Sequence, residues 1–170
     1  VRSLMKTSDF NFSLPDELIA QYPLAKRSDS RLLRYTRATK QTEHAAFASL
    51  LDALEPGDLL VMNDSRVIPA RLFGKKNTGG RVELLLERLL SDRQFLSHIK
   101  ASKSPKPGTR IELDDNWVIC VLEKQDDIYV CELVGEGSLD TMFHAIGHIP
   151  LPPYITREDE TPDFERYQTV

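Results

Sequence analysis

The stretch GDLLVMNDSRVIPARLFGKKNTGGRVELLLE, residues 57–87, decides the fold of this chain. Its apolar run Leu59-Leu60-Val61-Met62 lies between turn-forming residues, and this pattern predicts a short strand that is buried on both faces. Asn63, Asp64 and Ser65 end the run, because short polar side chains bond their own backbone and favour turns. Side chains at the end of a buried strand are well placed to meet a ligand, although an ordinary turn explains the same residues.

A second strand, which carries Arg71, follows over residues 69–73, and the chain resumes as a strand over residues 81–87. Thr78, Gly79 and Gly80 form the turn between them, since glycine permits positive φ or a close backbone approach. Four further alternating segments, separated by turn signals, lie at residues 95–100, 109–113, 117–124 and 128–134. Six strands at this regular spacing predict an antiparallel barrel or a small sandwich.

We therefore expect an α+β or mixed α/β fold, in which a β-barrel of about six strands interrupts an α/β domain. The expected segments are residues 5–66 for the first part of the α/β domain, 67–148 for the barrel and 149–170 for the return. Residues 1–4 precede Met5, and we set them aside as an upstream start or a remnant.

Outside the barrel strands, the sequence predicts two helices and two strands before the barrel and one helix after its last strand. A short helix is capped by Ser13 and stops before Pro23. Strands are expected at residues 32–35 and 42–44, and Phe47, Leu50, Leu51 and Leu54 recur as one face of an amphipathic helix. Ser138 is expected to cap a helix over residues 139–146, and the prolines of residues 150–153 predict a stiff, extended strap.

Composition indicates an ordinary globular protein, with 41% hydrophobic and 28% charged residues and a net charge of −4. Positive charge concentrates at residues 26–40 and 66–81, which favours either a local phosphate-binding face or plain solvated charge. Cys120 and Cys131 lie in expected strands and have no metal-ligand spacing, so we expect no metal and buried reduced thiols, with a cross-strand disulfide as the alternative. The sequence has no long apolar run, and we expect a cytoplasmic monomer that does not enter a membrane.

Three motifs resemble the S-adenosylmethionine:tRNA ribosyltransferase-isomerases of queuosine biosynthesis. They are LPDELIAQYPLAKRSDSRLL, NDSRVIPARLFGKKNTGG, and GHIPLPPYITR with ERYQTV, and the resemblance extends from Asp9 to Val170. Ser65 stands where the family usually has threonine, which keeps the hydroxyl. Family members are about twice this length, so we expect this chain to be the N-terminal half of a longer protein or a truncated member, with part of the active site missing.

The resemblance implies that the ribosyl group of S-adenosylmethionine is transferred and isomerised onto 7-aminomethyl-7-deazaguanine at the wobble position of tRNA. Epoxyqueuosine-tRNA forms, and adenine and methionine leave. S-adenosylmethionine is then a ribosyl-donating substrate, and tRNA is the macromolecular partner. The alternatives are a catalytically incomplete RNA-binding module and an S-adenosylmethionine-dependent tRNA methyltransferase, against which the missing glycine-rich turn counts.

The residues and the resemblance together give a set of candidate site residues. Asp64 is the candidate proton-handling or ribose-binding carboxylate, and His148 is a candidate for proton transfer or for a structural or substrate-positioning role. The candidates for substrate binding are Arg27, Arg31, Asn63, Ser65, Arg66, Arg71, Thr78, Gly79, Gly80, Tyr154, Arg157, Arg166, Tyr167 and Gln168. Arginines among them offer bidentate contacts to carboxylate or phosphate, with surface salt bridges as the plain alternative.

Overall fold

The computed structural model describes residues 5–169. Residues 1–4, the expected upstream start or remnant, lie outside the described part, as does Val170, the last residue of the third motif. The chain forms two compact units, one of residues 5–61 with 152–157 and one of residues 62–151 with 158–169. The expected domain boundaries at 66/67 and 148/149 remain predictions.

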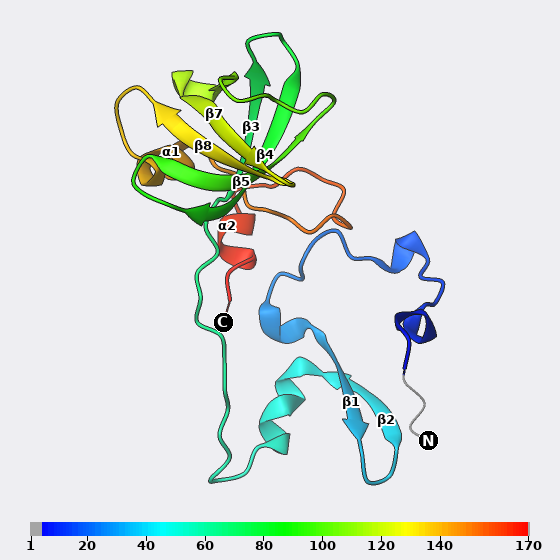
Figure 1. The fold of residues 1–170 in the computed structure, drawn as a ribbon. Helices are drawn as coiled ribbons and strands as arrows, with labels where there is room; N and C mark the ends of the chain where they lie inside the picture. The colour runs from blue at the N-terminus through cyan, green and yellow to red at the C-terminus, as the bar shows by residue number, and fades with distance from the viewer. Residues whose placement is uncertain (1–4, 170) are drawn as a thin grey trace. The chain divides into compact units, whose positions relative to one another are not determined.

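The larger unit is built on a closed barrel of antiparallel strands in the order β3-β4-β5-β8-β7-β6 (Figure 1). Its strands are β3 (Arg71–Lys76), β4 (Arg81–Leu89), β5 (Gln94–Ala101), β6 (Arg110–Leu113), β7 (Val118–Gln125) and β8 (Ile128–Val134). The prediction of a six-stranded antiparallel barrel is therefore confirmed. Pairing of β3 with β6 closes it, from Gly74 opposite Leu113 to Lys76 opposite Ile111.

The barrel closes because alternate side chains point inward along every strand. Leu72, Leu84, Phe95, Ile111 and Ile119 are completely buried. Gly74 lets β3 approach β6, since a Cβ at this position would lie 2.6 Å from the backbone oxygen of the β6 residue that pairs with Lys75. A small residue at this inward position is thus part of how the barrel closes.

Helix α1 (Leu139–Ile146) follows the last strand and packs on the barrel core. The Ser138 hydroxyl accepts a hydrogen bond from the Thr141 backbone N–H, so the predicted cap is confirmed. The Phe95 and Phe143 rings meet edge to face with their centroids 5.7 Å apart. The helix therefore anchors the chain directly before His148.

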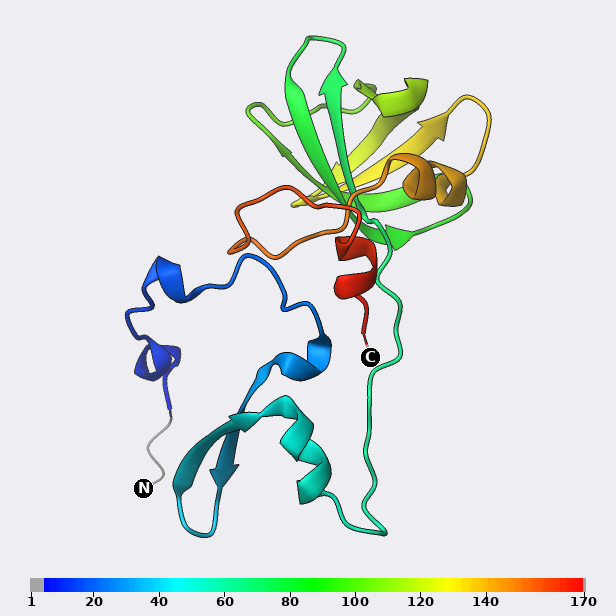
Figure 2. The same cartoon turned by 180° about the vertical axis from the view of Figure 1, so that it is seen from behind.

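Helix α2 (Asp163–Arg166) lies beside the segment that leads into β3, as Figure 1 and Figure 2 both show. The Asp163 carboxylate, which is buried, accepts a hydrogen bond of 2.8 Å from the Glu160 backbone N–H ahead of this short helix. Gln168 then reaches back to the entry segment: its Oε1 accepts from the Val67 N–H at 2.8 Å, and its Nε2 donates to the Val67 carbonyl at 2.9 Å. The entry and exit segments of the barrel are held together by these bonds.

The smaller unit contains a two-stranded sheet of β1 (Arg31–Thr36) and β2 (Gln41–Ala46). Its helical turns are the 3-10 helices η1 (Thr7–Phe10), η2 (Asp16–Leu18), η3 (Arg27–Asp29) and η4 (Phe47–Ala53). One further 3-10 helix, η5 (Asp114–Asn116), follows β6 in the barrel. Both strands of the small sheet confirm the prediction from the sequence.

Three local predictions are wrong. The run of residues 59–62 forms no strand in the described chain, and Leu59 and Val61 are 88% and 82% exposed. A short apolar run predicts a buried strand only if neighbouring strands cover it, and none of the described strands pairs with these residues. The turn at Asp16 is preceded by Pro15 and has no side-chain cap, so Ser13 does not cap it. The expected amphipathic α-helix at Phe47 is the 3-10 helix η4, with no buried residue.

Candidate functional site

In the polar loop at Asn63–Arg66, the last three residues form one wall of a cavity of about 360 Å³. The Asn63 Oδ1 accepts a hydrogen bond of 2.9 Å from the Ser65 backbone N–H, so the predicted turn chemistry is present. The opposite wall comes from α2 and the residues after it, including Gln168 and Thr169, and the Thr169 hydroxyl donates to the Ser65 carbonyl. The second and third sequence motifs therefore meet here.

His148 is fixed by backbone pairing with the first residue of β3. The Arg71 N–H donates to the His148 carbonyl at 3.1 Å, and the His148 N–H donates to the Arg71 carbonyl at 2.8 Å. Gly147 makes this approach possible, because a Cβ there would lie 2.2 Å from the backbone oxygens of both Phe143 and Pro69. Its φ of −76° is ordinary, so space and not backbone conformation requires the glycine.

The His148 ring contacts a carboxylate that the sequence did not reveal. Its Nδ1 lies 2.8 Å from the Asp159 Oδ1, and the Asp159 Oδ2 accepts a hydrogen bond of 3.0 Å from the Ile149 N–H. The Asp159 side chain is only 9% exposed, whereas that of His148 is 37% exposed. With its proton on Nδ1, an imidazole donates to the Asp159 Oδ1 and has the Nε2 lone pair available as a base.

A cavity of about 350 Å³ surrounds this pair. Asp114 of η5 lines it from the barrel, and Glu160, Thr161 and Phe164 line it from the chain after the proline strap. The His148 and Phe73 rings also form a T-shaped pair, with a centroid distance of 5.0 Å and an interplanar angle of 69°. A histidine held by a buried carboxylate beside a cavity has the arrangement that proton transfer requires.

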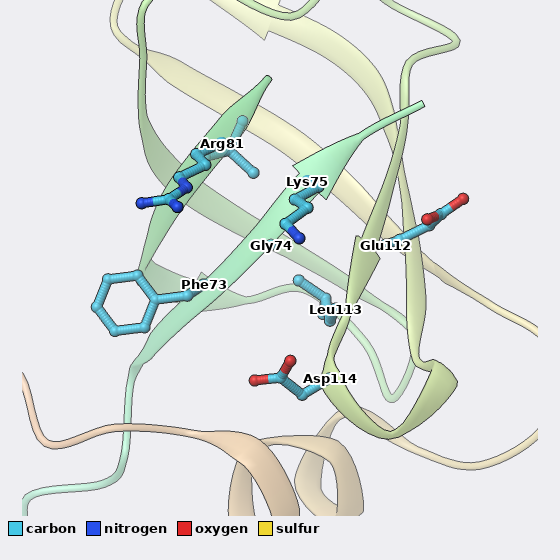
Figure 3. A pocket seen from close by; sticks show the side chains of 8 residues that line it. Phe73, Gly74, Lys75, Arg81, Glu112, Leu113 and Asp114 are labelled. Atoms are coloured by element: carbon cyan, nitrogen blue, oxygen red, sulfur yellow. The ribbon is translucent and has the colours of Figure 1, made fainter. Parts of the chain in front are cut away.

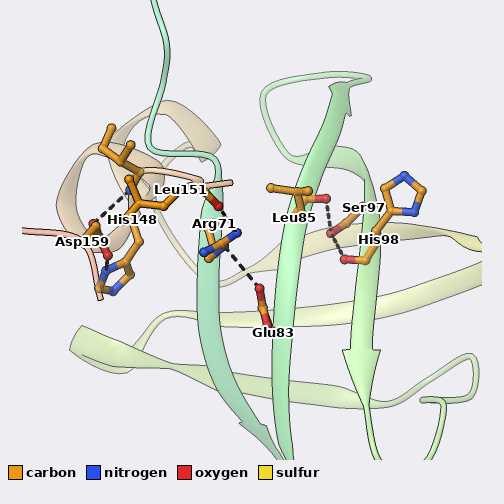
Figure 4. A network of polar contacts seen from close by, with 9 residues as sticks. Arg71, Glu83, Leu85, Ser97, His98, His148, Leu151 and Asp159 are labelled. Atoms are coloured by element: carbon orange, nitrogen blue, oxygen red, sulfur yellow. Dashed lines mark hydrogen bonds and ion pairs between the residues drawn. The ribbon is translucent and has the colours of Figure 1, made fainter. Parts of the chain in front are cut away.

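Arg71 contacts both the segment that follows His148 and strand β4, as Figure 4 shows. Its Nη2 donates to the Leu151 carbonyl at 3.1 Å, and its Nε lies 3.2 Å from the Glu83 Oε1. The Nε contact is an ion pair without directed hydrogen-bond geometry, since no acceptor is aligned with this buried atom in the described chain. These contacts make Arg71 an anchor for the segment that follows His148.

A second group of motif residues meets in the smaller unit. The Gln21 side chain donates to the Tyr154 carbonyl at 3.1 Å and accepts from the Thr156 N–H at 2.8 Å. The Arg157 Nε donates to the Gln21 carbonyl at 2.8 Å, and its guanidinium lies 4.3 Å from the centroid of the Tyr22 ring. The first and third motifs therefore meet through Tyr154 and Arg157, with Gln21 as a residue that sequence reasoning missed.

The remaining candidates lie on the following elements. Thr78, Gly79 and Gly80 form the β3–β4 turn, where Gly79 has a φ of +82°. Arg31 begins β1 and is exposed, and Arg27 lies in η3. Arg166 and Tyr167 are the end and the C-cap of α2.

Across residues 5–169 no group of three or more His, Cys, Asp or Glu side chains could hold a metal ion. None of the helices in this range is long and apolar enough to cross a bilayer. Cys120 and Cys131 are free thiols on neighbouring strands, and burial first, then the charge of Cys120, raises the pKa of Cys131 to about 12.

The fold and these contacts define an α+β protein with a closed antiparallel barrel, whose polar groups collect where the chain enters and leaves the barrel. The family model described as queuosine biosynthesis protein matches residues 7–170, and this chain belongs to that family.

Curated relatives agree with the family. The S-adenosylmethionine:tRNA ribosyltransferase-isomerases of Legionella pneumophila strains Paris and Corby are each 60% identical to the chain over 166 residues. The match covers 98% of this chain and 49% of each relative, so the chain spans about half the length of the curated relatives it matches. A crystal structure of the S-adenosylmethionine tRNA ribosyltransferase of Thermotoga maritima is 33% identical, with a TM-score of 0.42 over 82% of this chain and 48% of that one.

Proposed function

We propose that the protein to which this chain belongs transfers and isomerises the ribosyl group of S-adenosylmethionine onto 7-aminomethyl-7-deazaguanine at the wobble position of tRNA. The products are epoxyqueuosine-tRNA, adenine and methionine. The observation that carries this proposal is the 60% identity, over 98% of the chain, to relatives named for this activity. The proposal includes both S-adenosylmethionine and tRNA as partners of the protein, and a cytoplasmic location where tRNA is available.

Within this reaction we assign proton transfer to His148. The chemistry needs a base that removes a proton next to the sulfonium and an acid that assists the departure of adenine. An imidazole exchanges protons near neutral pH, and Asp159 holds the His148 ring at 2.8 Å in one orientation. Asp159 is then a positioning residue, because its second oxygen is already bonded to the Ile149 N–H.

Asp64 is the second group that we assign to the reaction, either as a base or as an acceptor for a ribose hydroxyl. It lines a cavity together with Ser65 and Arg66, which add a hydroxyl and a guanidinium. A guanidinium matches the carboxylate of the methionine moiety or a tRNA phosphate. In the smaller unit, Arg157, which lies over the Tyr22 ring and is bonded to Gln21, is a separate candidate for contact with a tRNA phosphate.

The test is adenine release from S-adenosylmethionine and precursor tRNA by the intact protein. The proposed reaction yields free adenine, whereas a methyltransferase yields S-adenosylhomocysteine, and an RNA-binding module without turnover yields neither. Detection of S-adenosylhomocysteine alone, or of neither product, would refute the proposal.

The residue assignments are tested with His148→Gln and Asp159→Asn. We expect His148→Gln to lower kcat by roughly 100-fold or more, the usual contribution of a positioned acid or base. Asp159→Asn should lower kcat less and change its pH profile, since the imidazole loses its charged partner. His144→Gln is the matched control, because the His144 Nδ1 also lies near an aspartate, Asp140, at 3.4 Å, but both side chains are exposed. Equal activity of His148→Gln and His144→Gln would remove His148 from the mechanism.

A further inference from the structure

A depression of about 500 Å³ lies on the outer wall of the barrel, away from the loop at Asn63–Arg66. Its lining comes from three strands: Phe73, Gly74 and Lys75 of β3, Arg81 and Val82 of β4, and Glu112 and Leu113 of β6, with Asp114 after β6. Figure 3 shows Phe73, Lys75, Arg81 and Asp114 around one space, with the Glu112 carboxylate turned away from it. The floor is the barrel wall, so this is a preformed shape on rigid strands.

Two cations lie side by side at this depression. Lys75 and Arg81 are direct cross-strand partners in the β3–β4 register. Like charges in such positions repel each other. Neither cation forms an ion pair in the described part of the chain, although Glu112 lies opposite Lys75 on the neighbouring strand β6. A bound anion between the two cations would relieve their repulsion.

An aromatic ring stands next to the cations. Phe73 is 44% exposed, because its neighbours Leu72 and Gly74 point into the barrel and side chains alternate along a strand. An exposed ring offers a stacking surface, and the Asp114 carboxylate offers an acceptor for N–H groups. Adjacent cations, an aromatic face and an acceptor match the phosphate, the base face and the base edge of one nucleotide.

The depression also adjoins the cavity around His148. Asp114 lines both, and the Phe73 ring contacts the His148 ring. A strand whose reacting nucleotide lies at His148 therefore has a neighbouring nucleotide within reach of Phe73.

We propose that this depression, formed by Phe73, Lys75, Arg81 and Asp114, binds a nucleotide of the tRNA next to the one that is modified. The base stacks on Phe73, and Lys75 with Arg81 holds the phosphate. This inference rests on the proposed function, because tRNA is the substrate that supplies the nucleotide.

The electrostatic half is tested by measuring the affinity of the intact protein for precursor tRNA as a function of salt. For a single strand the slope of log K against log salt falls by about 0.7 for each phosphate contact that is lost. The double variant Lys75→Gln/Arg81→Gln should reduce the slope by about this amount, because the two cations hold one phosphate, and each single variant should reduce it by part of that amount. Arg88→Gln is the matched control, since Arg88 is exposed on the same strand as Arg81 but lies outside the depression. Slopes equal to that of Arg88→Gln would overturn the inference.

The stacking half is tested by a double-mutant cycle with abasic nucleotides placed one at a time around the modified position. Phe73→Ala should weaken binding of intact tRNA by roughly 5- to 150-fold, the value of one base stack. At one position next to the modified nucleotide, an abasic site should weaken binding by the unsubstituted protein but not by Phe73→Ala. Leu89→Ala, another exposed apolar truncation on the barrel, should show no such coupling.

Independent effects of Phe73→Ala and of every abasic site would overturn the inference even if adenine is released normally. Absence of adenine release from the unsubstituted protein would instead refute the proposed reaction, while the binding cycle still decides whether the depression holds a nucleotide. The two failures are therefore distinguishable.

Discussion

Gly147→Ala should displace His148 without disturbing the barrel core. The new methyl group would lie 2.2 Å from the Phe143 and Pro69 carbonyl oxygens, about 1.2 Å short of the 3.4 Å at which ordinary contact begins. Both obstacles are backbone atoms, so no side-chain rotation relieves them. A backbone shift of this size breaks the 2.8 Å hydrogen bond from the His148 N–H to the Arg71 carbonyl.

The expected loss follows from these distances. Forced overpacking costs about 1–3 kcal/mol, and the lost hydrogen bond adds about 1 kcal/mol. We therefore expect the free energy of unfolding to fall by about 3 kcal/mol. Displacement of a reacting group by about 1 Å can cost roughly 100-fold in rate, so adenine release should fall by that factor.

The assay is urea unfolding followed by the fluorescence of Trp117, the only tryptophan of the chain, which packs against the barrel core. Gly80→Ala is the control, because its methyl group would meet only the flexible end of the Lys76 side chain, 2.8 Å away. We expect that variant to change stability by less than about 0.5 kcal/mol. If Gly147→Ala matches Gly80→Ala in stability and also releases adenine at the normal rate, the packing argument is wrong.

Two more parts of the barrel give testable expectations. Arg93 donates to the carbonyls of Leu133, Gly135 and Gly137, so Arg93→Met should lower the free energy of unfolding by about 2–3 kcal/mol, whereas Arg88→Met should leave it unchanged in the same urea titration. Because burial raises the pKa of Cys131 from 9.0 to about 12, the stability that comes from its protonated form is complete below pH 9 and is lost as the pH rises toward 12. Unfolding at several pH values should show this decline, and Cys131→Ala should remove it. At neutral pH the half-buried Cys120 should react with a thiol reagent before Cys131, and equal rates would contradict the assigned burial.

The barrel could be predicted from the sequence because its signals are local. Each strand alternates inward and outward residues, and turns separate the strands, so periodicity and turn signals together located all six. The helix cap at Ser138 was also predicted correctly, since its hydroxyl accepts a hydrogen bond from the N–H of a residue only three positions away. These features need no knowledge of distant parts of the chain.

Residues 59–62 and Asp159 show where the sequence was insufficient. An apolar run is compatible with burial and with an exposed extended segment, and which one occurs depends on neighbours that the run itself does not encode. Asp159 sits in a short acidic run, Glu158-Asp159-Glu160, which is typical of solvated surface. Only the turn of the chain after the proline strap brings this one carboxylate under the His148 ring. Contacts between segments of irregular structure have no periodic signal.

The backbone bridge between Arg71 and His148 also has a consequence for the order in which the molecule assembles. It joins the two ends of the barrel segment. Forming the bridge first would close the whole intervening chain as a loop, at a cost in entropy, whereas this cost is small once the barrel is ordered. Such an interaction forms late in folding and opens early when the native state fluctuates. Mild denaturant should therefore release the amide protons of Arg71 and His148 to exchange, and abolish adenine release, while the barrel strands are still protected.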